Sequence, residues 1–170
     1  TNKKKPEFFV IPNKLSSDEK SKLFLKRAKL FLNVGLVKSV IKDLDSAIRF
    51  NPNSEKLLLT RSELYFDLKE FDKSENDLNI LVNKDSLNPI LYLLKANFYR
   101  KSYKKWYLVE ENYSKAIELD SFKSKLYVER ANFYRSLNIG KYDLAEKDFL
   151  KAIELDSLNS NIYSERAKFY

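Results

Sequence analysis

The chain has no cysteine and no histidine, and its 170 residues include only two glycines and four prolines. Without cysteine there is no disulfide framework, and the redox compartment stays undetermined. So few turn-forming residues argue against a sandwich or barrel with many tight turns and favour long helices. No apolar run approaches the roughly 20 residues that span a bilayer, so we expect no transmembrane segment.

The same absences limit catalysis. They remove Ser–His and Cys–His nucleophilic pairs, the commonest zinc ligands and the usual acid–base group at neutral pH. Glycine occurs only at positions 35 and 140, which excludes a glycine-rich phosphate loop. Neighbouring carboxylates such as Glu110 and Glu111 point about 100° apart on a helix and are interpreted as solvated surface. We therefore predict no enzyme, no cofactor and no metal site.

One twenty-residue segment occurs almost twice. Residues 115–134 read KAIELDSFKSKLYVERANFY, and residues 151–170 read KAIELDSLNSNIYSERAKFY, with fourteen identical positions and an offset of 36 residues. A catalytic site is normally assembled once, from scattered residues. A segment copied at a fixed interval is instead typical of a structural unit that stacks on itself.

Each unit contains two apolar helical stripes. In the first, a small residue follows a bulky apolar residue by four positions and precedes an aromatic by three, as in Tyr127, Ala131 and Tyr134. Apolar residues at i, i+4 and i+7 share one face of an α-helix. The small residues are Ala28, Ser62, Ala96, Ala131 and Ala167; a further apolar position between the stripes holds Val37, Phe71, Trp106 and Tyr142. The pattern predicts helix–turn–helix units in which the small residue lets the two helices approach closely and the large residues, Trp106 included, fill the core.

This pattern resembles the tetratricopeptide repeat (TPR) family. The resemblance rests on the small residue and the aromatic of each first helix, and on Ala47, Ala116, Ala152 and Pro52 in the positions that follow. It implies an all-α fold, a right-handed α-solenoid of stacked helix–turn–helix repeats with a concave groove lined by the first helices. The predicted parts are an extended arm at 1–15, repeats at 16–54, 55–88, 89–123 and 124–159, and the first helix of a fifth repeat at 160–170.

Local signals support the expected boundaries. Ser16 and Glu19 form a capping-box pattern before the first helix, and Asn88 followed by Pro89 predicts an N-cap and the first helical residue of another. Prolines at positions 6 and 12 exclude a regular helix through the arm, which either packs over the first helix pair or docks on another chain.

Both ends of the sequence suggest a longer natural protein. The last helix exposes Ile162, Tyr163 and Phe169, so we expect the protein to continue beyond Tyr170, as part of a larger chain or complex. The first residue is a threonine, so a removed leader stays open, and the cytoplasm is only weakly favoured as its compartment.

Positions on the first helices that do not pack on neighbours are expected to face the groove. The first half of the groove is mainly apolar, and the second half presents asparagines and cations at equivalent positions one repeat apart. Asparagine can pair with a peptide backbone and arginine with a carboxylate, which suits an extended or helical partner segment with apolar and acidic side chains. The candidate binding residues are Leu25, Lys29, Leu59, Phe66, Leu93, Asn97, Arg100, Lys101, Val128, Asn132, Arg135 and Lys168. The alternative is an unused soluble face or a surface for assembly.

A basic residue precedes each small one: Arg27, Arg61, Lys95, Arg130 and Arg166. In three units an aspartate, Asp43, Asp77 or Asp148, follows on the second helix, and in the third unit Asn112 stands opposite Lys95. We predict an ion pair or hydrogen bond between the two helices at these positions. The alternative is a row of cations reserved for a ligand.

The net charge of +8 makes nucleic acid an alternative partner. Residues 1–54 carry twelve basic and five acidic residues (+7), but residues 55–88 carry five and eight (−3). A groove that follows a nucleic-acid backbone would be basic throughout. We therefore favour a scaffold that binds or organises other proteins, with an RNA-binding helical repeat and a regulatory segment of a larger enzyme as alternatives.

Overall fold

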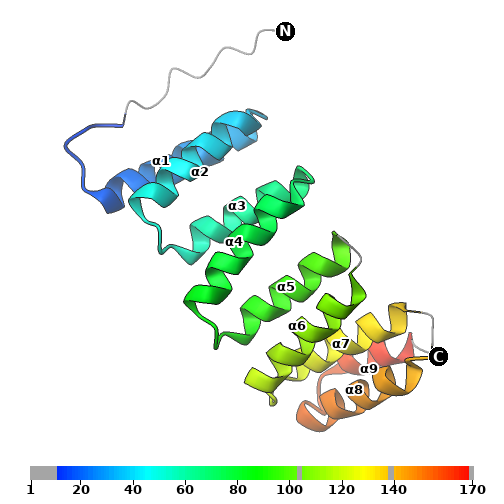
Figure 1. The fold of residues 1–170 in the computed structure, drawn as a ribbon. Coiled ribbons are helices and arrows are strands. Elements are labelled where there is room, and N and C mark those ends of the chain that lie inside the picture. Colours follow the sequence, from blue (N-terminus) through cyan, green and yellow to red (C-terminus); the bar gives the residue numbers. More distant parts are fainter. Residues whose placement is uncertain (1–10, 103–104, 138–139, 169–170) are drawn as a thin grey trace. The chain divides into compact units, whose positions relative to one another are not determined.

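The computed structural model describes residues 11–102, 105–137 and 140–168, and this part of the chain contains nine α-helices and no strand (Figure 1). The helices are α1 (Ser17–Asn33), α2 (Val37–Phe50), α3 (Glu55–Asp67), α4 (Phe71–Lys84), α5 (Pro89–Lys101), α6 (Trp106–Leu119), α7 (Ser124–Ser136), α8 (Tyr142–Leu155) and α9 (Ser160–Ala167). The all-α prediction is confirmed. Of the residues predicted as an N-terminal arm, positions 1–10 lie outside the described residues.

The chain divides into two compact units, residues 1–77 and 78–170. The division falls inside α4, within the segment 55–88 that the sequence predicts as one repeat. Unit 1 contains the α1–α2 pair and α3, and unit 2 contains the α5–α6 and α7–α8 pairs, with α9 against α7 and α8.

Small residues lie where paired helices meet. Ala28, Ala96 and Ala131 are at most 2% exposed, and the alanines near the ends of the second helices are equally buried. The crossing of α3 and α4 uses two serines instead. Ser74 Oγ donates to the Ser62 carbonyl oxygen at 2.8 Å, and Ser62 Oγ lies 3.0 Å from Ser74 Oγ. Serine is small enough for this close approach, and the two hydroxyls satisfy each other within the crossing.

The predicted helix starts are confirmed in detail. Ser16 caps α1 in a reciprocal capping box with Glu19, and Asn88 caps α5 with Pro89 as its first residue. Three turns inside helix pairs hold a left-handed residue. Gly35 has φ of 74°, and Lys69 and Gly140 each have φ of 61°. Lysine at this φ is strained relative to glycine by roughly 1 kcal/mol.

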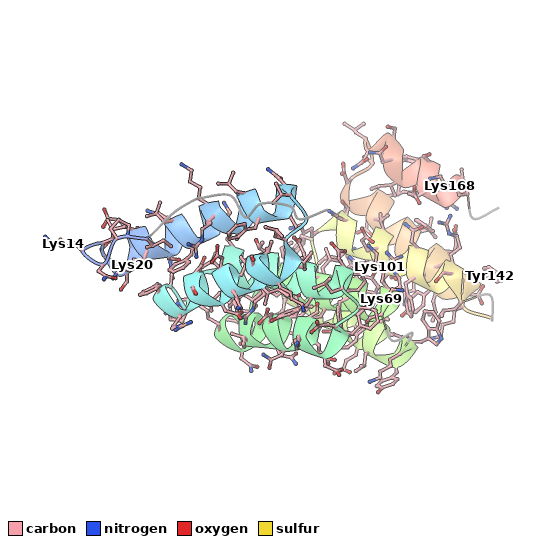
Figure 2. The ribbon with its side chains drawn as sticks, turned by 90° about the horizontal axis from the view of Figure 1, so that it is seen from above. Lys14, Lys20, Lys69, Lys101, Tyr142 and Lys168 are labelled. Carbon is pink, nitrogen blue, oxygen red and sulfur yellow. The ribbon has the colours of Figure 1, made fainter. Side chains whose placement is uncertain are left out.

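Three core assignments are wrong. Trp106 is 43% exposed and rests one face on Phe133, with ring centroids 6.2 Å apart, and Tyr142, labelled in Figure 2, is 47% exposed. Both begin a second helix, where a side chain is flanked by the turn on one side. Ala167 is exposed, because no second helix packs on α9 among the described residues. Ile162, expected at the surface, is 2% exposed, while Tyr163 is 45% exposed. Tyr103, Phe169 and Tyr170 lie outside the described residues.

Candidate functional site

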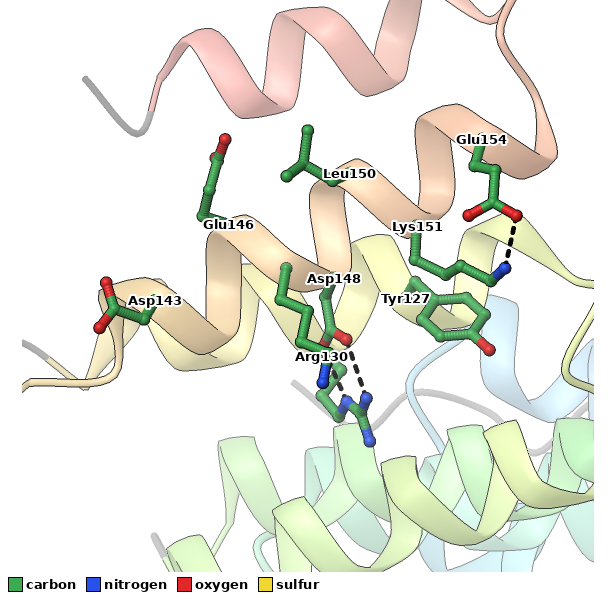
Figure 3. Close-up of a pocket in the computed structure, with 9 residues that line it drawn as sticks. Tyr127, Arg130, Asp143, Glu146, Asp148, Leu150, Lys151 and Glu154 are labelled. Carbon is green, nitrogen blue, oxygen red and sulfur yellow. Dashed lines mark hydrogen bonds and ion pairs between the residues drawn. The ribbon is translucent and has the colours of Figure 1, made fainter.

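The basic residues before the small positions connect helices. Arg27 pairs with Asp43 in unit 1, with Nη2 donating to Oδ1 at 2.6 Å and Nε to Oδ2 at 2.7 Å. Arg61 makes the same bidentate pair with Asp77, and Arg130 makes it with Asp148 (Figure 3). The three predicted ion pairs are confirmed. Hydrogen bonding to Asp43 raises the pKa of Arg27, and bonding to Asp77 raises that of Arg61.

The predicted partner in the third unit is wrong. Lys95 Nζ donates to Asn79 Oδ1 at 2.8 Å, on the preceding second helix, while Asn112 donates to the Leu108 carbonyl within its own helix. Arg61 also reaches backwards, to Asp45 at 2.7 Å, and Arg130 reaches Ser114 at 3.0 Å. Arg166 pairs with Glu146. These cations tie each first helix to a second helix, which leaves them unsuited to hold a ligand.

Shallow clefts lie over these pairs. One of them, about 650 Å³, is lined by Tyr127 and Arg130 from α7 and by side chains of α8, with the Lys151–Glu154 ion pair on its rim (Figure 3). Its floor is the Arg130–Asp148 pair, whose hydrogen bonds are already made. The described residues contain no group of His, Cys, Asp or Glu side chains that could hold a metal ion.

In unit 1 the candidate residues lie on α1 and α3. Leu25 is half-buried and packs against the core around Ala28, and Leu59 is half-buried as well. The Phe66 ring contacts Phe71 with centroids 5.4 Å apart. Lys29 is exposed. The candidate residues of this unit therefore comprise a partly apolar set and the cation of Lys29.

In unit 2 the α5 candidates differ in how much surface they offer. Leu93 is only 6% exposed and belongs to the buried core, so it offers almost no surface to a partner. Asn97 is half-buried, Arg100 is half-buried, and Lys101 is exposed. Among the described residues, no hydrogen bond or ion pair engages the Arg100 guanidinium. Arg100 is thus one of the candidate cations available for a carboxylate.

On α7 and α9 the candidate cations share an internal carboxylate. Arg135 Nη1 donates to the Glu165 carbonyl oxygen at 3.4 Å, and Lys168 Nζ donates to Glu165 Oε1 at 2.5 Å. Lys168, labelled in Figure 2, and more weakly Arg135 and Asn132, lower the pKa of Glu165. A partner carboxylate at this place would compete with Glu165. Val128, on the same helix, is half-buried.

The two candidate asparagines occupy equivalent positions but differ in their partners. Asn97 Oδ1 accepts a hydrogen bond from the Tyr113 hydroxyl at 2.9 Å. Asn132 Oδ1 is buried and has no hydrogen-bond partner among the described residues. The residue equivalent to Tyr113 in the next unit is Phe149, 36 positions later, which has no hydroxyl to donate. Aligning the two units on their shared segment would have revealed this difference, which the sequence analysis missed.

Comparison with protein-family models and with curated proteins found no match. Solved structures do match. A MamA protein superposes with a TM-score of 0.66 at 17% identity, over 89% of this chain and 81% of that one. A tetratricopeptide repeat protein from Parabacteroides merdae superposes with a TM-score of 0.72 at 16% identity, over 89% of this chain and 59% of that one.

The chain has the tetratricopeptide-repeat fold. A third TPR structure, the first TPR of Spaghetti (RPAP3) bound to the HSP90 peptide SRMEEVD, has a TM-score of 0.55 at 24% identity, over 68% of this chain and 89% of that one. At these identities the likeness concerns the TPR fold alone. No described helix has the length and apolar character needed to cross a membrane.

Proposed function

We propose that this TPR chain is a protein-interaction scaffold that binds an extended, acidic and partly apolar segment of another protein along α5 and α7. The observation that carries the proposal is the buried Asn132 Oδ1, which lacks a donor. A buried acceptor without a partner costs about 1–3 kcal/mol, and a bound segment that displaces the groups covering Oδ1 and donates a backbone N–H to it would remove that cost.

Arg100 supplies the complementary charge. It lies one repeat before Arg135 and makes no ion pair among the described residues, whereas Arg135 forms an ion pair with Glu165. An arginine can form a bidentate pair with a carboxylate. The RPAP3 repeat shows that a TPR can hold an acidic peptide.

The test is a peptide selection followed by calorimetry. Peptides selected from a displayed random library against the 170-residue chain are titrated into wild type, Asn132→Ala, Arg100→Ala and the control Arg49→Ala, an exposed arginine of unit 1. We expect acidic, apolar peptides whose affinity falls about tenfold in Asn132→Ala and at least as much in Arg100→Ala. Asn132→Ala should change the free energy of unfolding little, because it removes the unsatisfied Oδ1 together with the Asn132 hydrogen bond to Glu165. Equal affinity for all four proteins would reject the site.

A further inference from the structure

The end of the α1–α2 hairpin concentrates positive charge. The two helices pack side by side and are joined by the turn at residues 34–36 (Figure 1). Residues 26–42, called here the hairpin tip, form this end of the pair and contain five basic residues and no acidic one. Lys29, Lys38 and Lys42 are exposed and form no ion pair among the described residues. These lysines therefore present positive charge that the described residues do not neutralise. The five basic residues are Lys26, Arg27, Lys29, Lys38 and Lys42.

The equivalent segment of the next helix pair carries the opposite charge. Residues 60–76 lie one 34-residue period later and contain the α3–α4 turn, with three basic and five acidic residues, a net charge of −2 against +5 for the hairpin tip. Within that segment Lys73 pairs with Glu70. Both segments close a helix pair of the same kind, so packing does not require the lysines of the hairpin tip. A surplus of exposed cations that packing does not need indicates an anionic partner.

Exposed aliphatic side chains lie among these lysines. Leu30 is 40% exposed, Leu32 is 51% exposed and Val34 is 39% exposed, all within five residues at the end of α1. Single exposed aliphatic residues are ordinary, but three beside a surplus of lysine form an amphipathic surface. Such a surface suits the boundary between lipid headgroups and acyl chains, because lysines contact anionic headgroups while the apolar groups leave water.

Two other anionic partners fit the hairpin tip less well. Single-stranded nucleic acid is held by aromatic stacking, but the one aromatic residue of the tip, Phe31, is half-buried and packs on the core around Ala28. Carboxylates of an acidic protein are matched by the fork of an arginine, but the one arginine of the tip, Arg27, is already paired with Asp43. Lysines act as compact point charges, which suits a layer of anionic headgroups. The side chains that the tip exposes therefore favour a lipid surface.

We infer that the hairpin tip is a docking surface for the anionic face of a phospholipid bilayer. Its lysines lie at the headgroups, and Leu30, Leu32 and Val34 enter the boundary of the acyl chains. The tip belongs to unit 1, whereas the peptide site proposed above lies on α5 and α7 of unit 2, so the inference does not depend on that function. Binding of this kind is peripheral and needs no helix that spans the bilayer.

Vesicle flotation tests the inference. The 170-residue chain is mixed with vesicles of phosphatidylcholine alone, or of phosphatidylcholine and phosphatidylserine. We expect at least about tenfold tighter binding to the vesicles that contain phosphatidylserine, because their surface attracts the lysines of the tip. High salt should reduce this difference, because it screens the attraction between exposed charges.

Two double variants with the same net charge locate the contact. Lys29→Gln with Lys38→Gln should weaken binding to phosphatidylserine vesicles at least about tenfold, since each lysine near an anionic surface contributes about fivefold. The control, Lys56→Gln with Lys125→Gln, removes two exposed lysines outside the tip and should change the binding much less. Both variants should keep the thermal midpoint of wild type, because the altered side chains lie at the surface.

A fluorescent label tests whether the aliphatic residues leave water. The chain has no cysteine, so Leu32→Cys accepts a single environment-sensitive fluorophore. Its emission should shift to shorter wavelength when phosphatidylserine vesicles are added. Leu68→Cys, at a residue 38% exposed in the α3–α4 turn, is the matched control and should keep its emission unchanged. Equal binding to the two kinds of vesicle, equal losses in the two lysine variants, or an unchanged emission at position 32 would each overturn the inference.

Two further probes identify the other anionic partners. Binding of a labelled single-stranded RNA that Lys29→Gln with Lys38→Gln weakens, in a chain that does not bind vesicles, would assign the tip to nucleic acid. The same result with labelled polyglutamate would assign it to an acidic protein. Either result would replace the bilayer proposed here.

Discussion

The α5–α6 and α7–α8 helix pairs of unit 2 are built on one pattern, yet they satisfy their internal polar groups in different places. In α5–α6 the Tyr113 hydroxyl donates to Asn97, and Lys95 donates to Asn79 on α4. In α7–α8 Arg130 and Asp148 form a bidentate pair, and the Asn132 oxygen has no donor. The repeat thus fixes the volume and position of each side chain, while hydrogen bonding is free to vary between copies. A position where one copy leaves a polar atom unsatisfied is where a ligand can contribute most.

The largest effect should come from the Arg130–Asp148 ion pair of α7–α8, in whose place α5–α6 has Lys95 and Asn112. Asp148 is 4% exposed, so Asp148→Ala leaves the Arg130 charge partly buried without its carboxylate. We expect the free energy of unfolding to fall by about 2–4 kcal/mol. The equivalent change Asn112→Ala removes only a bond within its own helix and should cost about 1 kcal/mol. Urea denaturation followed by circular dichroism measures both.

The control for this pair of variants is Asp143→Ala, which removes an exposed carboxylate from the same helix α8. It should change the free energy of unfolding by less than about 0.5 kcal/mol. If Asp148→Ala and Asn112→Ala cost the same, the two helix pairs do not differ as described.

Exchanging tyrosine and phenylalanine between positions 113 and 149 should leave Asn97 without its hydrogen-bond donor and give Asn132 a donor. Tyr113→Phe removes the donor to Asn97 and should cost about 1–2 kcal/mol, while Phe149→Tyr offers Asn132 a donor and should add up to about 1 kcal/mol. Phe149→Tyr should also weaken the peptides selected against wild type, because the Asn132 oxygen would then be occupied.

Phe149 is fully buried, so an added hydroxyl could instead overpack the core. A double-mutant cycle with Asn132→Ala separates the two effects. If Phe149→Tyr changes the free energy of unfolding equally with and without Asn132, no hydrogen bond has formed, and the comparison of the two asparagines loses its basis.

The sequence predicts the helices well because their signals are local and repeated. The spacing of Ala96 and Ala131 from their aromatics, and the caps at Ser16 and Asn88, depend on helix geometry alone. The partner of Lys95 could not be predicted in this way, because Asn79 and Asn112 lie on different second helices and only packing decides between them. The 43% exposure of Trp106 and the 6% exposure of Leu93 likewise depend on tertiary packing and not on the local pattern.

A further effect should appear at alkaline pH and should separate the Tyr113 position of α5–α6 from the equivalent Phe149 position of α7–α8. Burial raises the pKa of Tyr113 to about 12, above its ordinary value near 10, and Phe149 has no ionisable group in the equivalent position. The folded chain therefore keeps this proton where the unfolded chain loses it. The stability that Tyr113 contributes is complete below pH 10 and is lost as the pH rises from 10 through 12, with a loss of about half a kcal/mol already at pH 10.

Urea denaturation between pH 8 and pH 11 measures this slope for wild type, Tyr113→Phe and Tyr134→Phe. Tyr134→Phe is the matched comparison, because burial also raises the pKa of Tyr134 and its hydroxyl donates to Glu110 at 2.9 Å. Each variant should show a shallower fall in the free energy of unfolding than wild type, and the double variant a shallower fall than either. If Tyr113→Phe retains the full wild-type slope, the Tyr113 phenol does not hold its proton in the folded chain, and the alkaline difference between the two helix pairs is absent.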